Sequence, residues 1–385
     1  MTRALLVRGA AALLLVASSA ACSVLNAKTL RIGVTDEPLN LSAAYADEAS
    51  ALVGGLVQAG LYRPDSALRP QPLLAEGSPV VSAGGTAWSI TLKPGLTFHD
   101  GSSVTPDDVV FTYELAKDGQ CPLSADICDL VRTRLETVEA DGVDGVRFHL
   151  FASWAPWGTR GLTIPILPKA AIERSLERFR ESIKDADRAL LTATRESILS
   201  SLDATSCGGG VSSSCEYAPF ISQLERTLSQ AGIALPDPRI LPVLNGGAQG
   251  GAARNDEAYA RDLFDRLTRL ESYLLAPSES QLELAFPLLD VQLAPIGAGP
   301  YEFAERTPGE SLTLEAFRGF AVGEPSIRRI VVMRYASQSL AVSAFQAADL
   351  DWVPNLTAAS ASFSAERWYS PKGVPSTGIT NSPST

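Results

Sequence analysis

The residues best suited to acid–base chemistry are a histidine–aspartate pair and a pair of neighbouring aspartates. His99 precedes Asp100, and such a carboxylate can orient an imidazole that acts as a general base. Asp107 and Asp108 bring two further carboxylates together. No G-x-S-x-G nucleophile motif accompanies them, and the sequence contains only one other histidine, His149. These observations predict that the protein is not an enzyme, and they argue against a histidine-rich zinc site.

The neighbouring aspartates also match the start of a helix. Thr105 suits the N-cap, Pro106 suits the first helical position, and Asp108 completes a capping box. The helix dipole favours acidic side chains in this first turn. We therefore predict a helix over 105–117 and interpret both aspartates as capping residues.

Five cysteines offer a second kind of chemistry. Four of them form close pairs, Cys121 with Cys128 and Cys207 with Cys215, and exported proteins pair their cysteines as disulfides. Neither pair has the C-x-x-C spacing that favours zinc. We predict both disulfides, which leaves Cys22 as the odd cysteine.

The N-terminus predicts a signal peptide over residues 1–21. Two arginines precede a short apolar run over 9–17, and small residues follow it. The run is too short to span a bilayer, and no later apolar run reaches about 18 residues. We therefore expect an exported mature chain without a transmembrane helix.

Cys22 directly follows the small residues and resembles the lipidated cysteine of a bacterial lipobox. Ser19 departs from that motif, which usually has leucine there, and an ordinary signal peptidase could cleave after Ala21. The odd cysteine count favours lipidation. We predict that residues 22–28 tether the protein to a lipid on the outer side of the cytoplasmic membrane or in the periplasm, with free secretion as the alternative.

The composition is that of an acidic globular protein. Of the 385 residues, 45% are hydrophobic and 19% are charged, which excludes a disordered or collagen-like chain. The net charge of −11 argues against a nucleic-acid partner, because proteins that bind the phosphate backbone carry basic faces. No glycine-rich phosphate-binding motif occurs, and we expect no cofactor and no metal.

Hydrophobic periodicity predicts mixed strands and helices at both ends of the chain and mainly helices between them. Strands are expected at 29–35, 87–92, 132–139, 145–151, 301–303, 312–314 and 327–335. Helices are expected at 47–61, 105–117, 178–202, 255–276 and 337–348, with another starting near residue 170. Residues 176–290 form a helical insertion whose glycine clusters indicate loops. We expect 29–35, 87–92 and the last three strands to share one core.

Five segments, in order, carry a resemblance to a known family. They are 30–41, 60–76, 88–113, 295–312 and 341–351. The most specific is Trp88–Gly101 followed by Val104–Tyr113. These segments resemble the extracellular solute-binding protein family 5 of ABC importers, which includes dipeptide-, oligopeptide- and nickel-binding proteins.

The resemblance implies an α/β, periplasmic binding protein-like fold of the class II type, in which two lobes close on a ligand. One lobe would comprise 29–175 and 291–354, interrupted by the helical insertion. Family members continue through a second lobe, so we expect that lobe to be truncated here. Residues 355–385 are expected to form a disordered or truncated tail.

The resemblance also bears on individual residues. It implies that His99 belongs to a strand-end turn and that Gly297-x-Gly299-Pro300 is a structural loop needing unusual φ angles. Tyr45, Ala46 and Asp47 match a loop that offers backbone groups to an extended peptide in relatives. Asp47 is alternatively the N-cap of the next helix.

Trp154 and Trp157 flank Pro156 on a predicted loop. Aromatic side chains on a loop can line a ligand cleft, and they can equally pack in the core. We therefore treat both tryptophans as candidate ligand contacts, with core packing as the alternative.

The function implied by the resemblance is capture of peptides, or of a similar small solute, for delivery to an ABC permease. The protein would contact the membrane only through its lipid anchor. Two alternatives stay open. One is a non-transport envelope lipoprotein that binds a protein partner through the lobe and the helical insertion, and the other is a truncated product without binding activity.

Overall fold

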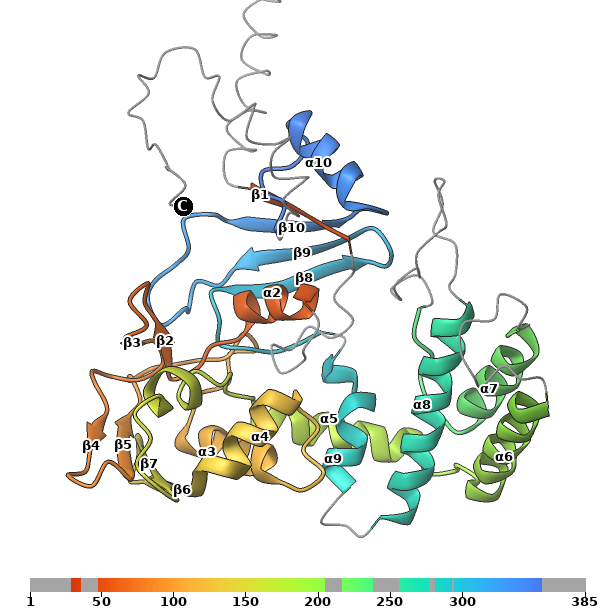
Figure 1. Cartoon of the computed structure of the whole chain (residues 1–385), viewed down its shortest axis with the longest axis horizontal. Helices are drawn as coiled ribbons and strands as arrows, with labels where there is room; N and C mark the ends of the chain where they lie inside the picture. The colour runs from red at the N-terminus through yellow and green to blue at the C-terminus, as the bar shows by residue number, and fades with distance from the viewer. Residues whose placement is uncertain are drawn as a thin grey trace, which may run out of the picture.

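The computed structural model describes residues 29–35, 48–204, 217–237, 256–276, 281–292 and 294–354. Together these residues form a mixed α/β structure with two four-stranded sheets and one two-stranded hairpin (Figure 1). Among the described residues, no helix is both long enough and apolar enough to cross a membrane.

The first sheet joins the two ends of the described chain. Its order is β1 (Thr29–Val34), β10 (Arg329–Arg334), β9 (Ser311–Ala316) and β8 (Tyr301–Thr307). β1 runs parallel to β10, and the remaining pairs are antiparallel. Every second side chain of β9 and of β10 points into one core, as the two-residue period of a strand requires. Leu312 and Leu314 do so on β9, and Ile330 and Val332 do so on β10.

Two helices cover this sheet. Helix α2 (Glu48–Val57) packs on β8 and places Val53 and Val57 in the core of the sheet. Helix α10 (Gln338–Gln346) contacts β1. The chain after α10 then returns to the free edge of β1, where the Gly33 N–H donates to the Trp352 carbonyl at 2.9 Å.

The second sheet is antiparallel throughout. Its order is β4 (Val80–Val81), β5 (Ala87–Thr91), β7 (Gly145–Leu150) and β6 (Leu135–Asp141). Helices α3 (Pro106–Lys117) and α4 (Ala125–Arg134) pack on β6, and α3 also contacts β7. The hairpin of β2 (Tyr62–Pro64) and β3 (Pro70–Pro72) lies beside it.

Two expectations about this region are wrong. The strand at 87–92 does not share a core with 29–35, because β5 pairs with β7 and its Trp88 and Ile90 belong to the other hydrophobic cluster. The strand expected at 132–139 begins only at Leu135, since 125–134 is helical. An amphipathic ten-residue segment has too little periodicity to distinguish these states before its packing partner is known.

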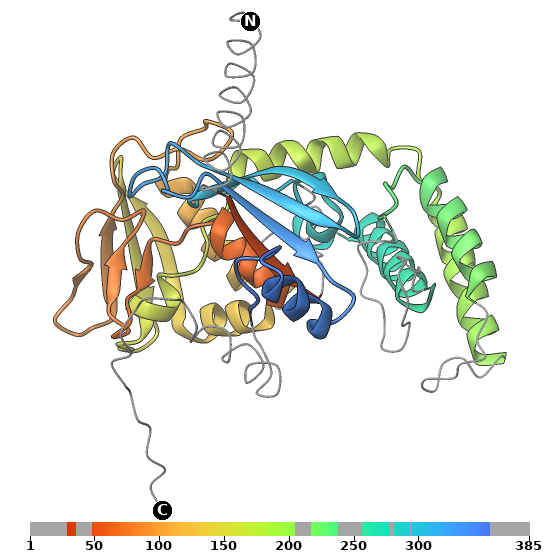
Figure 2. The same ribbon diagram turned by 90° about the horizontal axis from the view of Figure 1, so that it is seen from above.

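The middle of the chain is helical. Its elements are α5 (Lys169–Ser182), α6 (Arg188–Ala204), α7 (Ala218–Gln230), α8 (Asp256–Leu275) and α9 (Gln281–Ala285). Two short 3-10 helices, η4 (Phe286–Leu288) and η5 (Asp290–Gln292), follow. Figures 1 and 2 show α6, α7 and α8 gathered at the end of the molecule opposite β4 and β5, with α5 running toward them.

The single helix expected over 178–202 is in fact two helices. The first ends at Ser182 and the second starts at Arg188. The Asp187 carboxylate accepts hydrogen bonds from the Ala189 and Leu190 N–H groups at 2.9 and 3.4 Å, so it serves as an N-cap.

The helical segment is continuous with the core of the second sheet. Phe179, Leu263 and Leu267 belong to the same cluster of buried residues as Phe148 of β7. Among the helices, the Glu271 carboxylate accepts from Thr192 Oγ1 at 2.5 Å and from Arg195 Nε at 2.6 Å, which fastens α6 to α8.

Candidate functional site

His99 joins two segments that are far apart in the sequence. Its Nδ1 accepts from the Gly297 N–H at 3.3 Å, and its Nε2 lies 3.1 Å from the Gly299 carbonyl oxygen. The ring therefore carries its proton on Nε2 and donates it to that carbonyl. The ring of Phe317 packs edge-on at 4.7 Å between centroids. Burial lowers the pKa of His99, which keeps the imidazole neutral.

Asp100 does not orient this imidazole. Its carboxylate accepts from the Ser102 N–H at 3.0 Å, from Ser102 Oγ at 2.5 Å and from an Arg174 guanidinium N–H at 3.0 Å. Burial opposes ionisation, but the bonds from Ser102 and the charge of Arg174 lower the pKa of Asp100. Both His99 nitrogens and the Asp100 carboxylate thus serve structural contacts, as the strand-end turn predicts.

Gly297 and Gly299 lie against the end of α2. A Cβ at Gly297 would lie 2.0 Å from the Val57 carbonyl oxygen, and one at Gly299 would lie 2.5 Å from the Val57 carbonyl carbon. The Gly299 N–H donates to that oxygen at 2.9 Å. The expected reason for these glycines was wrong: neither has a positive φ, and close backbone approach excludes a side chain instead.

Asp108 caps α3. One carboxylate oxygen accepts from the Thr105 N–H at 2.8 Å and from Thr105 Oγ1 at 2.7 Å, and the other accepts from the Lys169 N–H at 3.0 Å. Asp108 is buried and its carboxylate is fully engaged. Its capping role agrees with the sequence pattern, and the bond to α5 is an addition that spacing alone did not indicate.

The two tryptophans lie in or beside the core. Trp157 starts a one-turn π-helix (Trp157–Gly161), is fully buried, and packs against Tyr113 and Phe148 at 6.0 and 5.9 Å between centroids. Trp154 is partly buried beneath the Arg134 guanidinium at 4.8 Å. The predicted ligand contact at Trp157 finds no support in this arrangement, because a fully buried ring offers no surface to a ligand.

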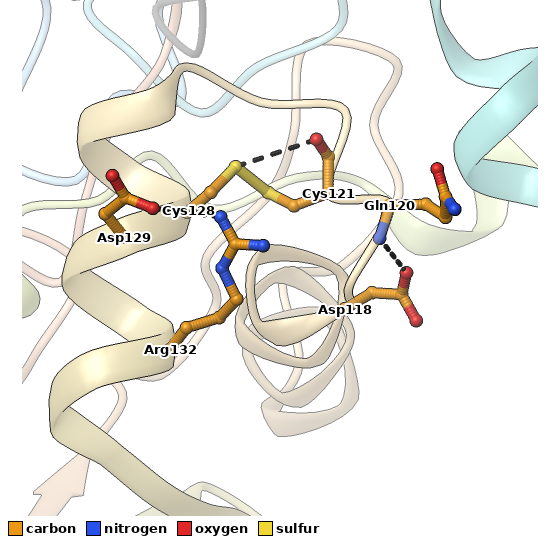
Figure 3. Close-up of a disulfide and its surroundings, with 6 residues drawn as sticks. All are labelled: Asp118, Gln120, Cys121, Cys128, Asp129 and Arg132. Atoms are coloured by element: carbon orange, nitrogen blue, oxygen red, sulfur yellow. Dashed lines mark hydrogen bonds and ion pairs between the residues drawn. A yellow bond between two sulfur atoms is a disulfide. The ribbon is translucent and has the colours of Figure 1, made fainter.

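The structure joins Cys121 and Cys128 by a disulfide that closes the connection between α3 and α4 (Figure 3). Asp118 organises the same connection, since its Oδ1 accepts from the Gln120 N–H at 2.6 Å. The other predicted site residues lie outside the described residues: Cys22, Tyr45, Ala46, Asp47, Cys207 and Cys215.

A pocket of about 480 Å³ opens where the helical segment meets the first sheet. Its walls come from α5, residues 232–237, α8, residues 287–292, and the end of β8 with the turn that follows it. Phe179, Ile233 and Leu289 form a buried apolar floor, and Leu235 is exposed at 37%. The volume is within the range of small-molecule sites, so this pocket is the candidate binding site of the described residues.

Charged side chains line the same pocket. Asp290 accepts from Arg178 Nε at 2.7 Å, from an Arg178 terminal N–H at 2.8 Å and from Ser175 Oγ. The hydrogen bonds from Arg178 lower the pKa of Asp290 against the opposing effect of burial. Arg266 enters from α8, where its Nε donates to Asp262 at 2.7 Å. The sequence contained no signal for this site, because its residues converge from separate segments.

The family model for bacterial extracellular solute-binding proteins, family 5 middle, matches residues 69–187 and 268–380, which is more than half of the chain. The chain therefore belongs to this family of extracellular bacterial proteins, whose members bind solutes. The match contains the second sheet, strands β8, β9 and β10 of the first sheet, and helices α3, α4, α5, α9 and α10. Strand β1 precedes the match, and α6, α7 and residues 256–267 of α8 lie between its two parts.

Two curated relatives are similar over shorter stretches. The oligopeptide-binding protein AppA of Bacillus subtilis is 36% identical over 98 residues, which are 25% of this chain and 17% of AppA. Protein XP55 of Streptomyces lividans is 33% identical over 146 residues, which are 37% of this chain and 25% of XP55.

A solved structure shows the same fold. The structure of Bacillus subtilis AppA in complex with a nonapeptide matches with a TM-score of 0.53 at 20% identity, over 88% of this chain and 46% of AppA. The α/β, periplasmic binding protein-like fold is therefore confirmed. The chain spans about half the length of this solved relative and less of the curated relatives it matches.

Proposed function

We propose that this chain is a solute-capturing lipoprotein of an ABC importer, held outside the membrane by a lipid on Cys22, and that its solute is a peptide. The family match on both sides of the helical segment carries the proposal. The oligopeptide-binding relative and its nonapeptide complex favour peptides as the solute class. The small residues before Cys22 favour the lipid anchor.

Peptide uptake tests the solute class. The gene is deleted in an amino-acid auxotroph of the native bacterium, and growth is measured on free amino acid and on peptides that contain it. We expect growth on the free amino acid and loss of growth on peptides, restored by the wild-type gene. Normal growth of the deletion strain on every peptide length would refute peptide capture.

The anchor is tested separately with Cys22→Ser. We expect the wild-type protein to carry a fatty-acid label and to fractionate with membranes, and the variant to lose both properties. A wild-type protein recovered unlabelled from the culture fluid would refute lipidation without bearing on peptide uptake.

Partner binding is the second candidate function, and one observation favours it. Helices α6 and α7 lie outside both parts of the family match, so the solute binding that the match implies does not account for them. If the deletion strain takes up peptides normally, in-cell crosslinking from exposed Leu199 of α6 should identify an envelope protein. Absence of any crosslink from α6 would refute this alternative.

A further inference from the structure

The pocket at the junction of the helical segment and the first sheet is lined partly by residues inside the family match and partly by residues outside it. Arg178 and Phe179 of α5 and residues 287–292 lie inside the family match. Residues 232–237 and Arg266 lie outside it. Seven of the 18 lining residues therefore come from the part of the chain that the family match does not cover.

The floor of the pocket suits an apolar group. Phe179, Ile233 and Leu289 are buried beneath it, and Leu235 forms an exposed apolar rim. Phe179, Ile233 and Leu289 are at most 7% exposed, so of these four side chains Leu235 supplies most of the apolar surface that a ligand group can remove from water. The volume of about 480 Å³ admits a small molecule and not a folded partner.

Three arginines, Arg178, Arg266 and Arg306, and two aspartates, Asp237 and Asp290, line the pocket, so its charged side chains favour an anion over a cation. The Asp290 carboxylate is already occupied by Arg178 and Ser175, so it offers little to a ligand cation. Arg266 donates through Nε to Asp262, and among the described residues no other hydrogen bond of Arg266 is formed. Its two terminal amino groups therefore retain the paired donors that match a carboxylate.

We propose that this pocket binds a small amphipathic carboxylate, with the apolar body over Phe179, Ile233 and Leu235 and the carboxylate on the terminal amino groups of Arg266. Binding at this pocket does not depend on peptide transport, because residues 232–237 and Arg266 lie outside the family match. A fatty acid of medium chain length or an aryl-alkanoic acid has the required chemistry.

Calorimetric titration of the purified full chain tests the proposal with octanoate and its uncharged analogue octanamide. We expect octanoate to bind at millimolar concentration or below and octanamide to bind at least about tenfold more weakly, since the charge-assisted bonds are lost. Absence of octanoate binding, or equal binding of both compounds, would overturn the proposal.

Matched variants locate the site. Arg266→Gln removes the proposed donor, and Arg269→Gln is its control, because Arg269 on the same helix also pairs with a carboxylate four residues earlier but does not line the pocket. Leu235→Trp fills the rim, and Leu199→Trp changes a leucine of similar exposure elsewhere.

We expect octanoate affinity to fall at least about tenfold in Arg266→Gln and Leu235→Trp and to stay unchanged in the two controls. Circular dichroism verifies that all four variants fold. Equal losses in Arg266→Gln and Arg269→Gln, or unchanged affinity in Leu235→Trp, would place the binding elsewhere and overturn the assignment.

Discussion

Replacing His99 by alanine should weaken the connection between the 98–101 turn and the 297–299 loop. The substitution removes the acceptor of the Gly297 N–H and the donor to the Gly299 carbonyl, and both glycines are buried. A buried polar group left without a partner costs about 1–3 kcal/mol. Two groups lose their partner, which would together cost about 2–6 kcal/mol. Because His99 is only partly buried, water can replace part of the lost bonding, and we expect the free energy of unfolding to fall by about 2–4 kcal/mol.

The same residue predicts a pH dependence with a definite sign. Burial lowers the pKa of folded His99 below its ordinary value of 6.5, so the unfolded chain takes up the proton first. The contribution of neutral His99 is therefore complete above pH 6.5 and is lost as the pH falls from there through the lower pKa of the folded state. In His99→Ala, the free energy of unfolding should depend less on pH in this window.

Urea unfolding followed by circular dichroism between about pH 5 and 8 measures both effects. The sequence has only two histidines, so His149→Gln is the matched control for titration in this range. The reasoning fails if His99→Ala loses less than about 1 kcal/mol at neutral pH. It also fails if the pH dependence is unchanged in that variant and disappears in the control.

Four further variants test other contacts by the same unfolding measurement. Gly299→Ala should destabilise the protein by about 1–3 kcal/mol, because the added Cβ would meet the backbone of α2 at Val57. Gly55→Ala is the control: Gly55 lies in α2 with open space around it, so this substitution should stabilise the protein by about 0.5–1 kcal/mol. Equal effects of the two substitutions would refute the close-approach argument. Burial raises the pKa of Glu283, so its contribution to stability is present at low pH and is lost as the pH rises through the folded-state pKa. Glu283→Gln should therefore be more stable than wild type at neutral pH, and the difference between the two proteins should grow as the pH rises through this range. A difference that does not change with pH would contradict this reasoning. Replacing Cys121 and Cys128 by serine should cost about 2–3 kcal/mol, and an unchanged midpoint under oxidising conditions would show that the bridge contributes nothing.

Several features of this protein were predictable because their causes act within a few residues. The capping box of Thr105 and Asp108 gave the start of α3 to within one residue. The close spacing of Cys121 and Cys128 indicated the bridge that the structure contains. Family-specific segments such as 88–113 indicated the fold class and the solute-binding family, both of which the comparisons confirm.

The tertiary structure alone decided which strands share a sheet. Strands β1 and β5 have the same alternating pattern, yet β1 pairs with β10 and β5 with β7. A two-residue period specifies which side chains are buried but does not identify the neighbouring strand. The sequence likewise did not indicate that Gly297 and Gly299 are needed for close approach to Val57, because that contact depends on where the distant helix α2 ends.

The candidate pocket shows the same limit most clearly. Arg178, Leu235 and Arg266 each have an ordinary local role in the sequence, as a helix-face charge or an apolar residue after a helix. They become neighbours only when α5, α8 and the 232–237 segment pack together. Local sequence patterns determine elements through nearby hydrogen bonds and side-chain periodicity, whereas a site made of distant residues exists only after long-range packing has brought them together.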